Sequence, residues 1–208
     1  LNIVNYVRGG GALLLAVGPE FAEKGSLYNT PLGRILPAKP SGKVINAGFQ
    51  PYMTAIGHRH PITGDLTGFG KLLNDGGTLK PAWGRWFRQI DTSARATHTL
   101  MRGHSSRPLL VLNQYEEGRV VVILSDHIWL WSRGFEGGGP YAELLRRTTH
   151  WLMKEPELEA ENLSAEIRDG KLMITRRSLS DALRKITVLH PNGITKEYSV
   201  KLSPNGLT

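Results

Sequence analysis

Two short apolar runs constrain the fold of this chain most strongly. The first, ALLLAV at residues 12–17, follows three consecutive glycines, and the second, RVVVIL at residues 119–124, contains five consecutive apolar residues. Runs of this length between turn residues are typical of strands buried on both faces, the pattern of parallel sheets. Residues 1–8 have the apolar spacing of a helix, and the glycines after them end it. Helix, glycine turn and buried strand together form half of a doubly wound α/β unit.

The segment between the two runs is expected to contain mostly loops. Prolines and glycines interrupt residues 18–77 repeatedly, although residues 30–36 can form a short helix with Pro31 in its first turn. Residues 81–88 carry aromatic side chains at near-helical spacing. Strands are predicted at residues 97–101 and 109–114, and Glu116-Glu117-Gly118 predicts a hairpin turn into the second apolar run.

The character of the chain changes near residue 155. Residues 141–153 predict an amphipathic helix, which Lys154-Glu155-Pro156 ends. Four shorter segments then alternate apolar and polar residues, and the turn dipeptides Asp169-Gly170 and Asn192-Gly193 lie between them. The predicted strands of this small antiparallel β module are residues 163–167, 171–175, 185–189 and 197–202. We therefore expect an α/β domain at 1–155 and a small β-rich C-terminal module at 156–208, both truncated.

Composition excludes several kinds of site. The chain contains no cysteine, which rules out thiol nucleophiles, thiolate metal sites and disulfides. The net charge is +8, but the basic residues are dispersed and no nucleic-acid motif is present, so we expect no nucleic-acid partner. No apolar stretch approaches the roughly 20 residues of a membrane helix. No motif for a cofactor is present either, and we expect none.

Two stretches, residues 6–18 (YVRGGGALLLAVG) and residues 119–153, resemble a known family. Together with TPLGRILP at residues 30–37 and His60-Pro61-Ile62-Thr63, they resemble the glutamine-amidotransferase-like domain of uncharacterised bacterial membrane-anchored proteins. That domain is a branch of the flavodoxin-like class I amidotransferase superfamily. The resemblance spans residues 1–161 and implies a truncated flavodoxin-like domain of a larger, membrane-anchored bacterial protein.

The resemblance also implies that strands upstream of residue 1 are missing. One edge of the sheet would then be exposed, unless the rest of the parent protein covers it. Association of two copies through that edge is therefore a second expectation about partners.

The family's catalysis does not carry over to this chain. Class I amidotransferases place a cysteine on the turn after a central strand and a histidine on a later strand as its base. The corresponding turn here, Ala16-Val17-Gly18-Pro19, offers no nucleophile, while His127 stands near the position of the base. We therefore expect a non-catalytic binding or scaffold domain. The alternative is a hydrolase or transferase whose nucleophile lies upstream of residue 1.

Asp126 and His127 are nevertheless the leading candidates for a site, because open α/β sheets bind ligands beyond the carboxyl ends of their strands. The competing interpretation is that Asp126 caps the following turn and His127 bonds locally. Trp129 and Trp131 are weaker candidates for an aromatic surface that binds carbohydrate or peptide. Burial of large aromatic side chains is the alternative, and we expect at least one of the two to be buried.

Three further patterns carry less weight. His58 and His60 could bind a metal together with His98 or His104, but their spacing shows no convergence, so we expect no metal. Ser125 lies in no G-x-S-x-G motif, which argues against a serine hydrolase. The glycines at 137–139 precede a helix and could bind an anion, although a flexible connection ended by Pro140 is the favoured interpretation.

Overall fold

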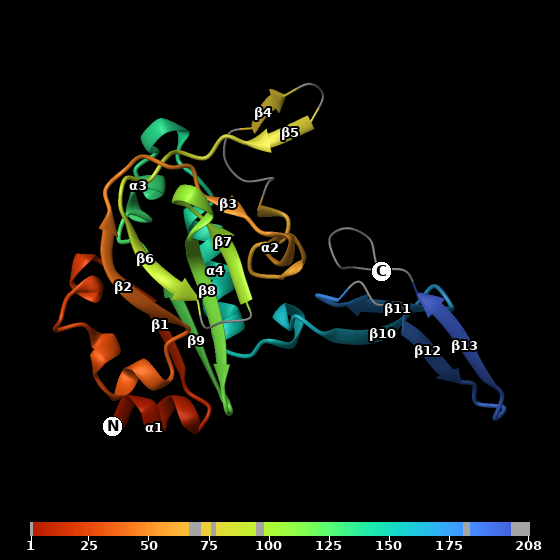
Figure 1. Ribbon diagram of the computed structural model, residues 1–208. Helices are drawn as coiled ribbons and strands as arrows, with labels where there is room; N and C mark the ends of the chain where they lie inside the picture. The colour runs from red at the N-terminus through yellow and green to blue at the C-terminus, as the bar shows by residue number, and fades with distance from the viewer. Residues whose placement is uncertain (1, 67–71, 76–77, 95–97, 181–183, 201–208) are drawn as a thin grey trace.

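The computed structural model describes residues 2–66, 72–75, 78–94, 98–180 and 184–200 (Figure 1). The α-helices are α1 (Asn2–Arg8), α2 (Ala55–Arg59), α3 (Trp129–Ser132) and α4 (Tyr141–Leu152). The short 3-10 helices are η1 (Pro19–Ala22), η2 (Leu27–Asn29), η3 (Pro31–Arg34), η5 (His104–Ser106), η6 (Phe135–Gly137) and η7 (Pro156–Leu158). The strands are β1 (Ala12–Ala16), β2 (Ala38–Ile45), β3 (Tyr52–Met53), β4 (Leu72–Asp75), β5 (Thr78–Pro81), β6 (Gln89–Ala94), β7 (His98–Arg102), β8 (Pro108–Tyr115), β9 (Gly118–Ile123), β10 (Asn162–Arg168), β11 (Lys171–Arg177), β12 (Arg184–Leu189) and β13 (Thr195–Val200).

A five-stranded mixed sheet in the order β1-β9-β8-β7-β3 forms the centre of the main body, residues 2–158. β1 and β9 are parallel, with Ala12 opposite Arg119, and the other neighbours are antiparallel. The expected parallel sheet is thus confirmed for one pair of strands only. β8 and β9 form the predicted hairpin, in which Tyr115 pairs with Gly118, and a tight hairpin requires antiparallel strands.

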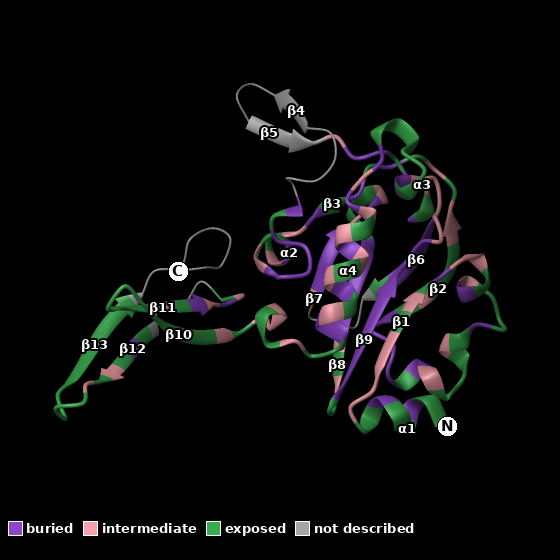
Figure 2. Cartoon of the chain, turned by 180° about the vertical axis from the view of Figure 1, so that it is seen from behind, coloured by how far each residue is buried: buried purple, intermediate pink, exposed green. Residues whose placement is uncertain are grey.

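The sheet has layers packed on both faces, and β9 is buried along its whole length (Figure 2). Val121 and Ile123 pack into the core on the α4 side. Val120 and Val122 pack on the opposite side, beneath α1, the 3-10 helices η1, η2 and η3, and the β2–β6 ribbon. The alternation follows from the two-residue period of a strand, so a strand buried on both faces must be apolar throughout.

β1 is an edge strand of this sheet and is less buried than the sequence predicted. Leu14 is 37% exposed, Leu13 and Leu15 are half-buried, and in the run at 12–17 only Val17 is buried. The prediction of burial on both faces is therefore wrong for this run. The reason is that β9 alone flanks β1 in the described part of the chain, so the other edge of β1 is open.

The segment predicted to be loop contains regular structure. β2 pairs with β6 across a bulge between Pro40 and Val44, and the bulge hides the alternation that would identify a strand. α2, β3 and the β4–β5 hairpin also lie in this segment. The aromatic residues after β5 are not helical, because Trp86 forms a bridge with Phe49 instead. Long-range contacts thus override local spacing in both places.

The C-terminal module, residues 162–200, consists of two antiparallel hairpins, β10–β11 and β12–β13. Both predicted turns are confirmed: Gly170 and Gly193 have positive φ angles of 71° and 81°, which glycine adopts without strain. β13 begins earlier than predicted, and its predicted end at residue 202 lies outside the described residues. In the described part of the chain, no helix is long and apolar enough to span a membrane.

Candidate functional site at the carboxyl end of β9

Ser125 leaves the sheet just after β9 and has a structural role. It is fully buried, and its hydroxyl donates to the Arg88 carbonyl oxygen at 2.6 Å. The Ser125 hydroxyl oxygen in turn accepts a hydrogen bond from the backbone N–H of His127 at 3.0 Å. The Ser125 hydroxyl thus acts as both donor and acceptor within the fold. This agrees with the absence of a G-x-S-x-G motif in the sequence.

Asp126 forms an ion pair with Arg88, whose Nη1 lies 2.7 Å from Asp126 Oδ2. The other carboxylate oxygen, Oδ1, is buried and has no hydrogen-bond partner in the described structure. Gly18, in the turn after β1, lies beside this carboxylate. A side-chain carbon at Gly18 would stand 3.5 Å from Asp126 Oδ2 and only 2.8 Å from Glu20 Oε2. The turn after β1 and the end of β9 therefore lie side by side, and the end of the flexible Glu20 side chain lies against Gly18.

The ring of His127 is held by a backbone hydrogen bond. Its Nδ1 accepts a hydrogen bond from the Phe87 backbone N–H at 3.2 Å, which places the proton of the neutral ring on Nε2. Nε2 lies 3.8 Å from Asp126 Oδ1, beyond hydrogen-bond distance. Burial lowers the pKa of His127; Asp126 opposes this shift and Arg88 adds to it. The neutral ring thus offers a single donor, Nε2–H, and no free acceptor.

The two tryptophans that follow lie on α3 and have different environments. Trp131 is buried, and its Nε1 donates to the Gly84 carbonyl oxygen at 2.7 Å. Its ring centroid lies 4.8 Å from that of Trp86 and 5.3 Å from that of Trp83. Trp129 is 51% exposed. The prediction that at least one of the pair is buried is confirmed, and the two rings do not form one aromatic surface.

Among the candidate metal ligands, His60 and His98 line one cavity, but the four histidines do not form a complete site. The structure, over the residues that it describes, contains no group of three or more His, Asp or Glu side chains placed to hold a metal ion. His60 is buried, and its Nδ1 accepts a hydrogen bond from the Ile62 backbone N–H at 3.2 Å.

The glycine segment before α4 is a packed connection. The Gly84 N–H donates to the Gly138 carbonyl oxygen at 2.7 Å, and a side-chain carbon at Gly139 would stand 2.4 Å from the Trp131 ring. These close approaches, together with positive φ angles at Gly137 and Gly138, explain why glycine is required there.

Sequence patterns missed a polar residue that joins the main body to the segment before the C-terminal module. Arg119, at the start of β9, is 7% exposed, and its two Nη atoms lie 2.5 Å from the Trp151 carbonyl oxygen and 2.5 Å from Glu159 Oε1. Together with His60, these residues line a cavity of about 450 Å³. A single arginine beside an apolar run carries no signal of such a role.

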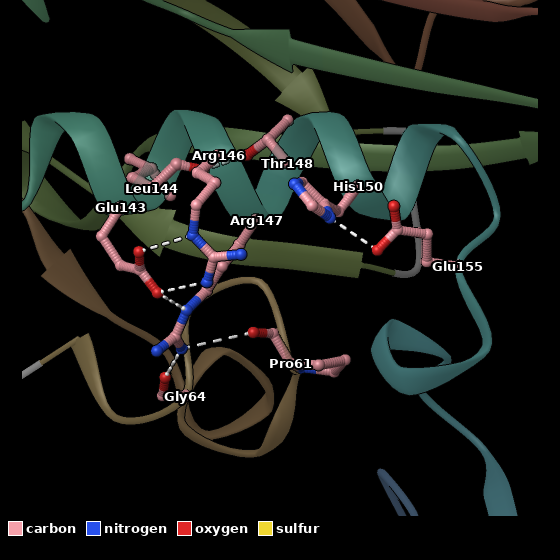
Figure 3. A network of polar contacts seen from close by, with 9 residues as sticks. All are labelled: Pro61, Gly64, Glu143, Leu144, Arg146, Arg147, Thr148, His150 and Glu155. Carbon is pink, nitrogen blue, oxygen red and sulfur yellow. Dashed lines mark hydrogen bonds and ion pairs between the residues drawn. The ribbon is translucent and has the colours of Figure 1, made fainter.

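A second polar cluster ties α4 to the loop after α2 (Figure 3). Glu143 accepts hydrogen bonds from Arg146 and Arg147, and Arg147 also donates to the carbonyl oxygens of Pro61 and Gly64. The hydrogen bond from Arg146 is the largest cause that lowers the pKa of Glu143 to about 2. Both guanidinium groups line a cavity of about 400 Å³, but the fold already pairs them.

Comparison with known proteins supports the fold alone. No protein-family model matches the chain, and no curated protein matches its sequence. Cytoplasmic Protein STM1381 from Salmonella typhimurium LT2 is similar in structure, with a TM-score of 0.57, 24% identity, and coverage of 72% of this chain and 58% of its own. Cytoplasmic Protein STM3548 from Salmonella typhimurium gives a TM-score of 0.56 at 21% identity, with the same coverage. The chain thus spans 58% of the length of these two proteins.

Proposed function

We propose that this chain is a non-catalytic, amidotransferase-like binding or scaffold domain of a larger bacterial protein. The observation that carries the proposal is the state of His127, whose Nδ1 is occupied by the Phe87 N–H. Acyl transfer by this superfamily needs a nucleophile and an adjacent base that accepts its proton. His127 has no free acceptor, and Gly18 stands where the nucleophile would be, with Glu20 against it.

The proposal extends to the fold of the parent protein. We infer that the main body is part of a flavodoxin-like domain and that further parallel strands pair with β1. The order α1, β1 and the parallel neighbour β9 supports this inference, because a helix that leads into a parallel strand is typical of βαβ units. The membrane anchor is implied by the sequence resemblance, and the parent sequence would test it through an apolar span of roughly 20 residues.

The test of the catalytic part is an assay of glutaminase activity on the 208-residue chain and on its parent protein. The chain should release ammonia only at the background rate. Turnover in the chain that His127→Ala abolishes, while His104→Ala leaves it unchanged, would overturn the proposal. The same pattern in the parent alone would favour the alternative, a hydrolase or transferase whose nucleophile lies upstream.

A further inference from the structure

Arg176 is a charged side chain buried where the strand pattern requires an apolar residue. Leu172, Ile174 and Arg176 lie on one face of β11, since side chains two residues apart share a face. Their partners on β10 are all apolar, and Arg176 itself stands opposite Leu163. The exposed fraction of Arg176 is only 7%. A guanidinium group therefore lies on the apolar side of the first hairpin.

No group of the described chain neutralises this guanidinium. Its Nη1 is buried without a hydrogen-bond partner, and Arg176 forms no ion pair with any described carboxylate. Glu161 borders the same cavity, but its Oε1 already accepts hydrogen bonds from the Ser178 hydroxyl at 2.8 Å and the Leu179 N–H at 2.9 Å. Arginine stays charged at any physiological pH, and a buried charge without a partner is costly. The arrangement therefore favours an anion from outside the chain.

Arg176 lines a cavity of about 400 Å³ between the two hairpins. Arg177 and Lys185 add two positive charges to its lining, and Glu161 adds one negative charge, so the net formal charge is three minus one, or +2. Lys185 also pairs with Glu197 at 2.8 Å, and Arg177 donates to the Glu157 carbonyl oxygen. Arg176 is thus the cation of this lining that the fold leaves without an acceptor.

We propose that this cavity binds a phosphate group. A phosphate monoester carries nearly two negative charges near neutral pH, which are opposite in sign to the net charge of the lining. The arginine fork fits phosphate oxygens in a bidentate geometry, so Arg176 supplies the central contact. Thr187, also in the lining, supplies a neutral hydrogen-bond donor, whereas the Asn162 amide already donates to the Pro156 carbonyl oxygen at 2.6 Å. The cavity volume falls within the range of small-molecule sites and holds an organic group as well as the phosphate.

Calorimetric titration of the 208-residue chain tests the site with glycerol phosphate and with inorganic phosphate as probes. Saturable binding of glycerol phosphate, with none for glycerol, is expected. Arg176→Leu should weaken it by at least about tenfold, since a hydrogen bond to a charged group typically contributes that factor. Arg168→Leu, an exposed arginine at the other end of the same hairpin, should leave binding unchanged. Tighter binding of glycerol phosphate assigns the site to an organic phosphate, and equal or tighter binding of inorganic phosphate assigns it to the free ion. Wild-type protein that binds neither probe would overturn the proposal.

Thermal unfolding separates this role from a structural one. Without phosphate, Arg176→Leu should unfold at the wild-type temperature or above, because it removes a buried unpaired charge. Glycerol phosphate should raise the unfolding temperature of the wild type and of Arg168→Leu but not of Arg176→Leu. Arg176→Lys keeps the charge without the fork and should show a smaller rise than the wild type. If Arg176→Leu unfolds at a lower temperature than the wild type without ligand, and glycerol phosphate still raises its unfolding temperature fully, Arg176 stabilises the fold instead of binding phosphate.

Discussion

The guanidinium group of Arg119 lies 4.7 Å from the centroid of the Trp151 ring. One side chain thereby connects β9, the end of α4 and, through Glu159, the segment that leads into the C-terminal module. Arginine suits this position because its planar group can stack on an aromatic ring while its edge donates hydrogen bonds. Arg119 therefore couples the main body to the segment before the module, while Arg59 Nη1 bonds directly to the Leu179 carbonyl oxygen of the module at 3.3 Å.

Replacement of Arg119 should destabilise the protein strongly. We expect Arg119→Met to lower the free energy of unfolding by about 2–3 kcal/mol, because Glu159 and the Trp151 carbonyl lose their donor while the apolar stem stays. Urea denaturation at neutral pH measures the change. Arg8→Met is the matched control, since Arg8 forms an exposed ion pair with Glu116 and its loss should have no measurable effect. Equal effects of the two substitutions would contradict the prediction.

The two tryptophans of α3 should respond differently to truncation. Trp131→Ala is expected to cost about 3–5 kcal/mol of unfolding free energy, because it opens a cavity beside Trp83 and Trp86 and leaves the Gly84 carbonyl without its donor. Trp129→Ala should leave the denaturation midpoint close to that of the wild type, since half of this ring is already in solvent. Wild-type midpoints for both variants would refute the burial argument.

Elements with a strong local pattern could be predicted from the sequence. β9 is apolar at five consecutive positions, and α4 repeats its buried residues at helical spacing, so both were located to within about a residue or two. The hairpin turns at Gly170 and Gly193 carry their own signal, since they need positive φ angles. In each of these cases, the information lies within the element itself.

The remaining elements depend on contacts that no local pattern records. β2 is a strand because it pairs with β6, about fifty residues later. In the candidate site, too, some features follow from local sequence and others depend on distant segments. The position of Asp126 and His127 follows from the end of β9, whereas their partners Arg88 and Phe87 come from a segment nearly forty residues earlier. Arg176 was missed for another reason: it lies just beyond the strand predicted at residues 171–175, and only its burial shows that it is unusual.

The stability of the protein should fall as the pH decreases from about 7.5 to about 5. Burial, aided by the charges of His98, Arg177 and Arg119, lowers the pKa of His60 from 6.5 to about 3. Below pH 6.5, His60 therefore binds a proton in the unfolded chain but stays neutral in the folded chain. The free energy of unfolding consequently falls by up to about 1.4 kcal/mol per pH unit until the pH reaches the pKa of the folded state. His127 shifts in the same direction and adds to the slope.

The contribution of His60 can be isolated by measuring urea midpoints across that pH range. His60→Asn should reduce the slope of the urea midpoint against pH, whereas His104→Asn should leave that slope as in the wild type. The range ends above the ordinary pKa of glutamate, so Glu143, whose stabilising effect is lost only as the pH falls from about 4.5 to about 2, does not interfere. An unchanged slope in His60→Asn would show that the ring is accessible to protons in the folded state.

The open edge of β1 has the features of a pairing surface. Gly11 accepts a hydrogen bond from the Arg119 N–H, and the Val17 N–H donates to Ile123, so the odd-numbered residues face β9. The backbone groups of Ala12, Leu14 and Ala16 consequently point to the open side. The strand carries no charge, proline or bulge, the features by which proteins usually protect an edge.

We therefore predict that the 208-residue chain self-associates by antiparallel pairing of β1 with β1 of a second copy. Sedimentation equilibrium should show an average mass that rises with concentration towards that of a dimer. Leu14→Lys should hold the chain as a monomer, because a charge at an edge opposes pairing and this side chain is already 37% exposed. Leu27→Lys, at a similarly exposed leucine on η2, should associate like the wild type. A wild-type chain that stays strictly monomeric over a wide range of concentrations would refute the prediction.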